Sequence, residues 1–227
     1  MTPFTIYTAK TTGAKQNKVY PNEMTVDNLT ALEQAMRRDH VCAKYKGNER
    51  SIANFQYADC IPMDCDNDHS ENPAEWMTPE KLEEIFSDVA YGLAPSRHNL
   101  IEKDGKAARP KFHVYFEIEE VRNAEKYAAL KRAIHREYPF FDGNALDAGR
   151  FLFGSSVGDV VWHDGWMTID AVIGPMEEEE DDFDWENPAC QSSRRTESPS
   201  QAEAEKSAMN MVMALTDFIC EHCTIND

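Results

Sequence analysis

The sequence predicts an α+β domain over residues 1–175, and three observations support this prediction. Residues 57–66 and 111–119 have the apolar or alternating patterns of strands. Residues 79–92 and 123–137 repeat apolar residues at helical spacing. From residue 58 onward the elements follow in the order strand, helix, strand, strand, helix, strand, which is the split βαβ pattern.

The clearest strand is residues 111–119, KFHVYFEIE, because its side chains alternate strictly. Successive residues of a strand point to opposite faces, so one face carries only apolar side chains and should face the core. The apolar set is Phe112, Val114, Phe116 and Ile118, and the opposite set is Lys111, His113, Tyr115 and Glu117. We expect the second set to face away from the core.

The helices have recognisable beginnings. Residues 25–39 form an amphipathic helix in which Thr30 and Glu33 have the spacing of a capping box. Thr78 and Pro79 are a hydroxyl N-cap followed by proline at the first helical position. Shorter strands are expected at 41–46, 93–101, 150–154 and 159–173, the last folded into a hairpin at Asp164-Gly165.

Composition limits the class of protein. The chain has 227 residues, 41% hydrophobic and 28% charged, with a net charge of -18. Residues 174–227 hold 14 acidic and 3 basic residues, so most of this charge lies outside the domain. An acidic total argues against nonspecific coating of nucleic acid. The sequence has no apolar run of membrane-spanning length and no signal-peptide pattern at its start, so we expect a cytoplasmic protein that does not bind membranes.

The C-terminal part differs from the domain in composition. Residues 176–200 are acidic and predict a disordered linker, and residues 201–227 predict one amphipathic helix. Cys220 and Cys223 have the spacing of a zinc knuckle, but no second ligand pair is near them. In a cytosolic chain the six cysteines are expected to be free thiols.

Asp64, Asp66 and Asp68 follow a predicted strand at a spacing of two, and three interpretations are open. A calcium loop of the EF-hand type would use Glu75 as its last ligand, but His69 replaces the required glycine. A polar turn explains Asn67 and Asp68 best. A magnesium or manganese site fits Asp64 and Asp66, because period two puts both carboxylates on one face of the strand.

Other segments supply the remaining parts of such a metal site. Asp147 offers a third carboxylate, with Arg150 close behind it. His113, Lys111 and Arg109 lie together at the start of the alternating strand, where they suit contact with a triphosphate. Two metal ions held by such acids stabilise both the attacking and the leaving oxygen when a phosphate bond is exchanged.

Three motifs together, MDCD, KFHVYF and DAGRFLFG, resemble those of the archaeo-eukaryotic primase superfamily, in order and over residues 40–173. They are most similar to the primase-polymerases of phages, plasmids and other mobile elements. The resemblance implies an N-terminal α/β unit packed on an RRM-like, split βαβ unit, with the active site between them. It also implies that Asp64, Asp66 and Asp147 bind two Mg²⁺ or Mn²⁺ ions and that His113 contacts the phosphates of the nucleotide.

The resemblance has one departure, since Lys111 stands where the superfamily often has a small serine. Ser96 takes that role, or Lys111 grips phosphate directly. The expected activity is template-directed transfer of nucleotides by a DNA primase-polymerase, in the host cytoplasm, on single-stranded DNA with a primer and NTPs or dNTPs. Lys111, Arg109 and Arg150 would position the triphosphate, and Ser96 and Arg97 would contact nucleotide or template. No helicase motif is present, so a helicase would act in trans.

Other functions remain open from the sequence. A non-catalytic RRM-like module would need exposed aromatic residues on its sheet face for base stacking. A metal-dependent nuclease needs similar carboxylates, and differs in shortening DNA instead of lengthening it. A catalytic remnant acting through its acidic tail would not need intact metal and phosphate residues.

Overall fold

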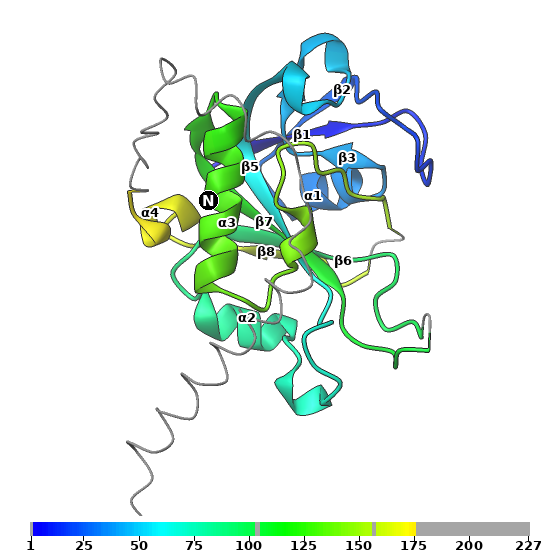
Figure 1. The fold of residues 1–227 in the computed structure, drawn as a ribbon, viewed down its shortest axis with the longest axis vertical. Coiled ribbons are helices and arrows are strands. Elements are labelled where there is room, and N and C mark those ends of the chain that lie inside the picture. The colour runs from blue at the N-terminus through cyan, green and yellow to red at the C-terminus, as the bar shows by residue number, and fades with distance from the viewer. Residues whose placement is uncertain (1, 103–104, 156–157, 176–227) are drawn as a thin grey trace, which may run out of the picture. The chain divides into compact units, whose positions relative to one another are not determined.

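The computed structural model describes residues 2–102, 105–155 and 158–175 (Figure 1). Contacts divide the chain into Met1–Glu177 and Glu178–Asp227, and the first unit holds every described residue. The expected linker, the expected last helix and the pair Cys220 and Cys223 lie outside the described residues. Cys42, Cys60 and Cys65 are free and buried, as expected for thiols.

Five strands form the main antiparallel sheet, in the order β4-β5-β7-β6-β8. Its centre is the pair of long strands β5 and β7, which the sequence patterns predicted. The members are β4 (Lys44–Tyr45), β5 (Phe55–Cys65), β6 (Tyr91–Pro95), β7 (Phe112–Val121) and β8 (Val161–His163). Because β7 runs antiparallel to both neighbours, β5 and β6 are parallel to each other, and the helix α2 (Pro79–Ile85) connects them.

This arrangement confirms one split βαβ unit but not the second. In the first unit β7 lies between β5 and β6. A second split unit would place β8 beside β5, whereas β8 pairs with β6 and the position beside β5 is taken by β4. The sequence order of strands and helices was therefore correct, and the position of the last strand was not.

A second, three-stranded sheet has the order β2-β1-β3 and was not predicted in this form. It contains β1 (Phe4–Thr8), β2 (Asn22–Val26) and β3 (His40–Val41). The expected strand at 41–46 is divided, because β3 belongs to this sheet and β4 to the main one. The short link of Cys42 and Ala43 thus joins the two sheets.

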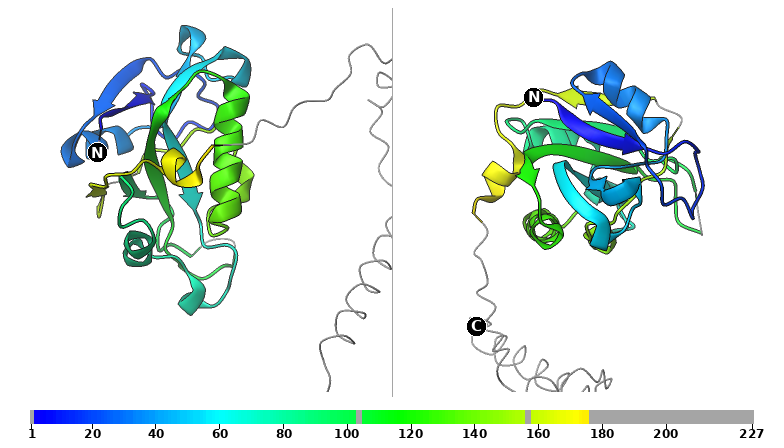
Figure 2. Two further views of the ribbon diagram at one scale, coloured as in Figure 1. Left: turned by 90° about the vertical axis from the view of Figure 1, so that its left-hand side faces the viewer. Right: turned by 90° about the horizontal axis from the view of Figure 1, so that it is seen from above.

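Helices cover the main sheet on one face. The helix α3 (Ala124–Glu137) packs on β5 and β7, and Figure 2 shows it on the side of the sheet opposite the first strands. Asn123 caps α3 by accepting from the amides of Glu125 and Lys126. The core between helices and sheet contains Leu82, Phe86, Phe116, Leu130 and Ile134.

The opposite face of the main sheet is also covered. Phe4 and Ile6 from β1, and Leu32 and Met36 from the helix α1 (Leu29–Met36), pack with Tyr115 of β7 in a second core. Tyr115 faces away from the first core, as expected, but it is fully buried, because a second core that the sequence did not predict covers its face of β7. Near its start the polar side of β7 stays partly open, at Lys111 and His113.

Short elements complete the described part. Single-turn 3-10 helices lie at Lys46–Asn48, Ile52–Asn54, Pro73–Glu75 and Gly143–Ala145. The helix α4 (Ile169–Ile173) replaces the strand expected there, and the only pairing seen for residues 150–154 is a bridge between Leu152 and His40. Asn28, and not the expected capping box, caps α1 by accepting from the Ala31 amide at 2.9 Å.

Asp164-Gly165 does not form the expected hairpin. A Cβ atom on Gly165 would lie 2.2 Å from the carbonyl carbon of Val89. The absence of a side chain lets Trp166 and Met167 donate backbone hydrogen bonds to Asp88, each at 3.0 Å. This glycine therefore allows a close backbone approach and not a tight turn.

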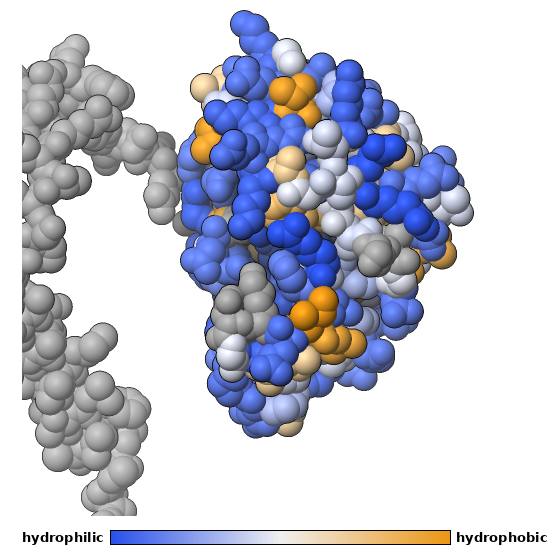
Figure 3. Space-filling view, turned by 90° about the vertical axis from the view of Figure 1, so that its right-hand side faces the viewer, coloured by the Kyte–Doolittle hydropathy of each residue, from blue (hydrophilic) through white to orange (hydrophobic). Residues whose placement is uncertain are grey.

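Some large apolar side chains are exposed in the described part, and Trp166 is the most exposed of them. The face drawn in Figure 3 is mainly hydrophilic, with apolar residues in small separate groups. Within the described ranges, no helix is both long and apolar enough to cross a bilayer.

Candidate functional site

The site begins where β5 and β7 pair at their polar ends. The register places Asp64 opposite His113 and Cys65 opposite Phe112. Neighbouring β6 pairs Ala94 with His113, so the end of β6 lies next to the same histidine. Beyond the strands, Ser96 donates its amide to the Lys111 carbonyl at 2.8 Å. The sheet therefore brings side chains from three separate segments to one edge.

The Asp64 carboxylate lies between an arginine and a histidine. Its carboxylate forms an ion pair with Arg150 and lies 3.5 Å from Nε2 of His113. Its side chain is only 5% exposed, whereas that of Arg150 is 37% exposed. The Nε atom of Arg150 is buried and has no hydrogen-bond partner among the described residues. One buried N–H donor of this guanidinium is therefore not satisfied by any described group.

Asp66 and Lys111 form the second charged contact. Nζ of Lys111 lies 3.6 Å from the Asp66 carboxylate and 3.4 Å from that of Asp68. Burial alone would raise the pKa of Asp68, but the ammonium groups of Lys106 and Lys111 lower that pKa below its ordinary value. Acids and bases are therefore interleaved along this edge.

The end of β5, the start of β7 and the segments after β6 and Asp147 line one open cavity of about 260 Å³. The cavity brings together the predicted residues Asp64, Asp66, Ser96, Arg97, Lys111, His113 and Arg150. It also contains four residues that the sequence analysis did not assign to the site, namely His98, Phe151, Leu152 and Phe153. The sequence signal for the two phenylalanines was their place in the motif DAGRFLFG, directly after Arg150.

Behind His113 lies a buried polar chain. His40 donates from Nδ1 to the Arg38 carbonyl at 2.8 Å, because a carbonyl oxygen can only accept. Its Nε2 then accepts from the Tyr115 hydroxyl at 2.8 Å, and the oxygen of Tyr115 lies 3.4 Å from Nδ1 of His113. Burial lowers the pKa of His40 to about 4, so this histidine is neutral at pH 7.

The pKa of His113 is also lowered. Burial is the main cause, the Asp64 carboxylate opposes it, and the Arg150 guanidinium acts in the same direction as burial. Nδ1 of His113 faces the buried Tyr115, while Nε2 faces Asp64 and the cavity. The fold thus presents one defined nitrogen to a ligand.

Arg109 does not join the cavity, contrary to expectation. Its side chain is completely buried and donates to the Asn67 carbonyl at 2.9 Å and to the Glu71 carboxylate at 2.7 Å. Its guanidinium carbon also lies 5.2 Å from the Trp76 ring. Arg109 therefore organises the loop after β5, while Lys111, two residues later, faces the cavity.

Asp147 likewise does not line the cavity that holds Asp64 and Asp66. Its side chain accepts from the Gly149 amide at 2.5 Å, it is exposed, and it is not among the residues lining the cavity. Across the described ranges, no group of three His, Cys, Asp or Glu side chains is positioned to hold a metal ion. The expected cage of three carboxylates is therefore not assembled in this structure.

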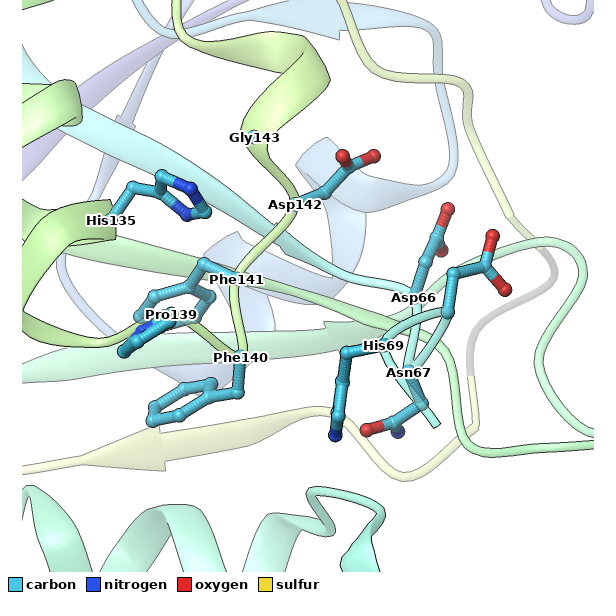
Figure 4. Close-up of a pocket in the computed structure, with 10 residues that line it drawn as sticks. Asp66, Asn67, His69, His135, Pro139, Phe140, Phe141, Asp142 and Gly143 are labelled. Carbon is cyan, nitrogen blue, oxygen red and sulfur yellow. The ribbon is translucent and has the colours of Figure 1, made fainter. Parts of the chain in front are cut away.

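In the loop after β5, Asn67 lies in a polar turn, as the sequence predicted. Asn67 is fully buried, has a positive φ of 53°, and accepts from the Met77 amide at 2.7 Å. A strand and not a helix precedes Asp64, which is unlike an EF-hand. Next to this loop lies a second hollow of about 260 Å³. In Figure 4 the rings of His135, Phe140 and Phe141 lie on one side of it and the Asp66–His69 segment on the other.

Comparison with solved structures finds a likeness to a phage domain. The AEP domain of the cyanophage S-2L Primase-Polymerase (PrimPol) is similar at 13% identity, over 72% of this chain and 82% of that chain, with a TM-score of 0.39. No protein-family model matches the sequence, and no curated protein is similar to it.

Proposed function

We propose that this chain is a nucleotidyltransferase, a DNA primase-polymerase that joins nucleotides on a single-stranded DNA template. One observation carries the proposal, the convergence of two carboxylates with a lysine, a histidine and an arginine in one cavity. Nucleoside triphosphates reach enzymes as complexes with a divalent cation, so their site needs both signs of charge. The sequence motifs that resemble primase-polymerases contain these same side chains.

The carboxylates suit a hard divalent cation. Asp64 and Asp66 offer oxygen ligands, which Mg²⁺ and Mn²⁺ prefer. Mg²⁺ is commonly held by one or two carboxylates with phosphate oxygens and water completing its shell, so two protein carboxylates are sufficient. Such an ion neutralises the charge that develops on the phosphate oxygens during the transfer. A second ion would need ligands beyond this pair.

The basic side chains would hold the triphosphate. Lys111 and Arg150 line the cavity next to the carboxylates, and charge-assisted hydrogen bonds from ammonium and guanidinium groups to phosphate are strong. The side chain of Arg150 is 37% exposed and lines the cavity, so its guanidinium would meet a phosphate there. His113 would present Nε2 to a phosphate oxygen while Tyr115 holds the other side of its ring.

A non-catalytic RRM-like module is less well supported. Such a module binds RNA by stacking bases on exposed aromatic residues of its sheet. In this fold the aromatic residue at the centre of the polar face of β7, Tyr115, is buried under β1 and α1. The sheet therefore offers no open stacking face at that position.

The test is extension of a labelled DNA primer on a single-stranded template with Mg²⁺ or Mn²⁺ and dNTPs. We expect Asp64→Asn and Asp66→Asn each to reduce incorporation by about 100-fold or more, since each removes a metal ligand. Glu84→Gln is the matched control, because Glu84 is exposed on α2 outside the cavity. Full incorporation by Asp64→Asn would refute the proposal, and shortening of the DNA without dNTPs would identify a nuclease.

A further inference from the structure

A stacked pair of side chains stands at the edge of the cavity that binds the triphosphate in our proposal. The guanidinium carbon of Arg97 lies 3.7 Å from the centre of the Phe153 ring. At this separation the cation lies against the ring face, which is the geometry of a cation–π contact. Arg97 follows the end of β6, and Phe153 belongs to the segment after Arg150, so the pair joins two parts of the site.

The ring is held firmly from behind. Phe151 contacts Phe153 edge-on at 4.9 Å between ring centres, and the Arg50 guanidinium lies 4.7 Å from the Phe151 ring. Leu152, between the two phenylalanines, is buried and exchanges backbone hydrogen bonds of 2.9 Å with His40 in both directions. The Phe153 ring is therefore presented by a segment that is fixed at its middle.

Among the described residues, the contact with Phe153 is the interaction found for the Arg97 guanidinium. Within the described parts of the chain, no carboxylate lies within ion-pair distance of Arg97, in contrast to Arg109 and Arg150. Both Arg97 and Phe153 are half-buried and line the cavity, so they are open to a ligand there. A guanidinium plane with free donors is a surface on which another flat, electron-rich group can stack.

We propose that Arg97 and Phe153 form the nucleobase subsite of the cavity, for the base of the same nucleotide whose triphosphate contacts Lys111, His113 and Arg150. This inference rests on the proposed function and goes beyond it by assigning the base. Stacking tolerates all bases, because every base has a π-face. A platform of this kind therefore holds each of the four nucleotides and leaves their selection to the template.

The inference is tested by measuring binding of each dNTP and of inorganic tripolyphosphate, with Mg²⁺, to the full chain by titration calorimetry. We expect every dNTP to bind more tightly than tripolyphosphate, which has no base. Phe153→Leu and Arg97→Lys should weaken dNTP binding roughly 5- to 100-fold, as expected for the loss of one stacked base. Tripolyphosphate affinity should stay the same in both variants, and Phe153→Tyr should restore dNTP affinity.

Other results have distinct meanings. Equal losses for dNTP and tripolyphosphate in Arg97→Lys would make Arg97 a phosphate ligand and overturn the subsite. Unchanged dNTP affinity in both variants, with weaker binding of single-stranded DNA, would assign the platform to the template and also overturn it. Wild-type protein that binds neither dNTP nor tripolyphosphate would remove the proposed function itself. Tripolyphosphate binding with no preference for dNTPs would remove the subsite alone.

Discussion

At the residue scale, the contacts of single side chains decide what the site can bind. Asp64 and Asp66 face the cavity beside cations, while Asp147 is exposed and bonded to its own turn. An exposed carboxylate outside the cavity acts on an ion only through water, where Coulomb interactions are weak. These three acids, equivalent in the sequence motifs, are therefore not equivalent in the structure.

This difference leads to a prediction for metal binding without nucleotide. We expect Asp64→Asn and Asp66→Asn to weaken Mn²⁺ binding at least about tenfold, as loss of a ligand does. Asp147→Asn should change it by no more than about threefold, because Asp147 does not line the cavity. Titration calorimetry of Mn²⁺ measures all three. Equal losses in the three variants would mean that the ion itself gathers the three-carboxylate cage expected from the sequence.

His40 makes the fold sensitive to acid. Its pKa falls from the ordinary value of 6.5 to about 4 in the folded protein, because burial penalises its charged form. Above pH 6.5 it is neutral in both states, and as the pH falls towards 4 the unfolded chain takes up a proton that the folded chain excludes. Stability is therefore lost in that window, by roughly 3 kcal/mol.

The variant His40→Gln isolates this effect, since glutamine is neutral and can both donate to Arg38 and accept from Tyr115. We expect its free energy of unfolding to depend less on pH than that of the wild type between pH 6.5 and pH 4. Denaturant unfolding at several pH values gives both curves. Parallel curves would show that His40 is protonated equally easily in the folded and unfolded states.

At the scale of elements, the close approach of two backbone segments explains why Gly165 does not form the turn that the sequence pattern predicted. Gly165 leaves room for the 88–90 backbone, and a methyl group there would lie 2.2 Å from Val89. We expect Gly165→Ala to destabilise the protein by about 1–3 kcal/mol, as overpacking does. Gly158→Ala is the control, because a methyl group at that position would have nothing within 4 Å. Equal melting temperatures for the two variants would contradict this account of Gly165.

The sequence predicted the helices and strands better than it predicted which groups they contact in the fold. The alternation around Val114 and Phe116 predicted β7, and the cap and helical spacing predicted α2 and α3. The sequence did not show that Arg109 and Lys111 have different roles, because both are basic and they are two residues apart. Their different roles depend on the loop carbonyls that receive Arg109, and sequence spacing does not reveal these. Asp164-Gly165 was misread for the same reason, since its partner is a distant backbone.

At the scale of the whole molecule, the first unit holds both hydrophobic cores found among the described residues. Both cores draw only on residues before 174 among those described. We expect a chain of residues 1–177 to melt within a few degrees of the full chain, because it keeps both of these cores and apolar burial is the main stabilising contribution. Thermal unfolding of the two chains by circular dichroism measures this. A much lower melting temperature for the shorter chain would show that residues 178–227 contribute to the stability of the first unit.

The ion pair between Arg150 and Asp64 has a thermodynamic consequence for the proposed site. A divalent cation entering alone must take Asp64 from Arg150 and leave the guanidinium without its counter-charge. A triphosphate entering alone pairs with Arg150 and leaves the Asp64 carboxylate without its counter-charge. When both enter, the partners are exchanged and each charge is again neutralised. Metal and nucleotide should therefore bind with positive cooperativity, each raising the affinity for the other by the same factor.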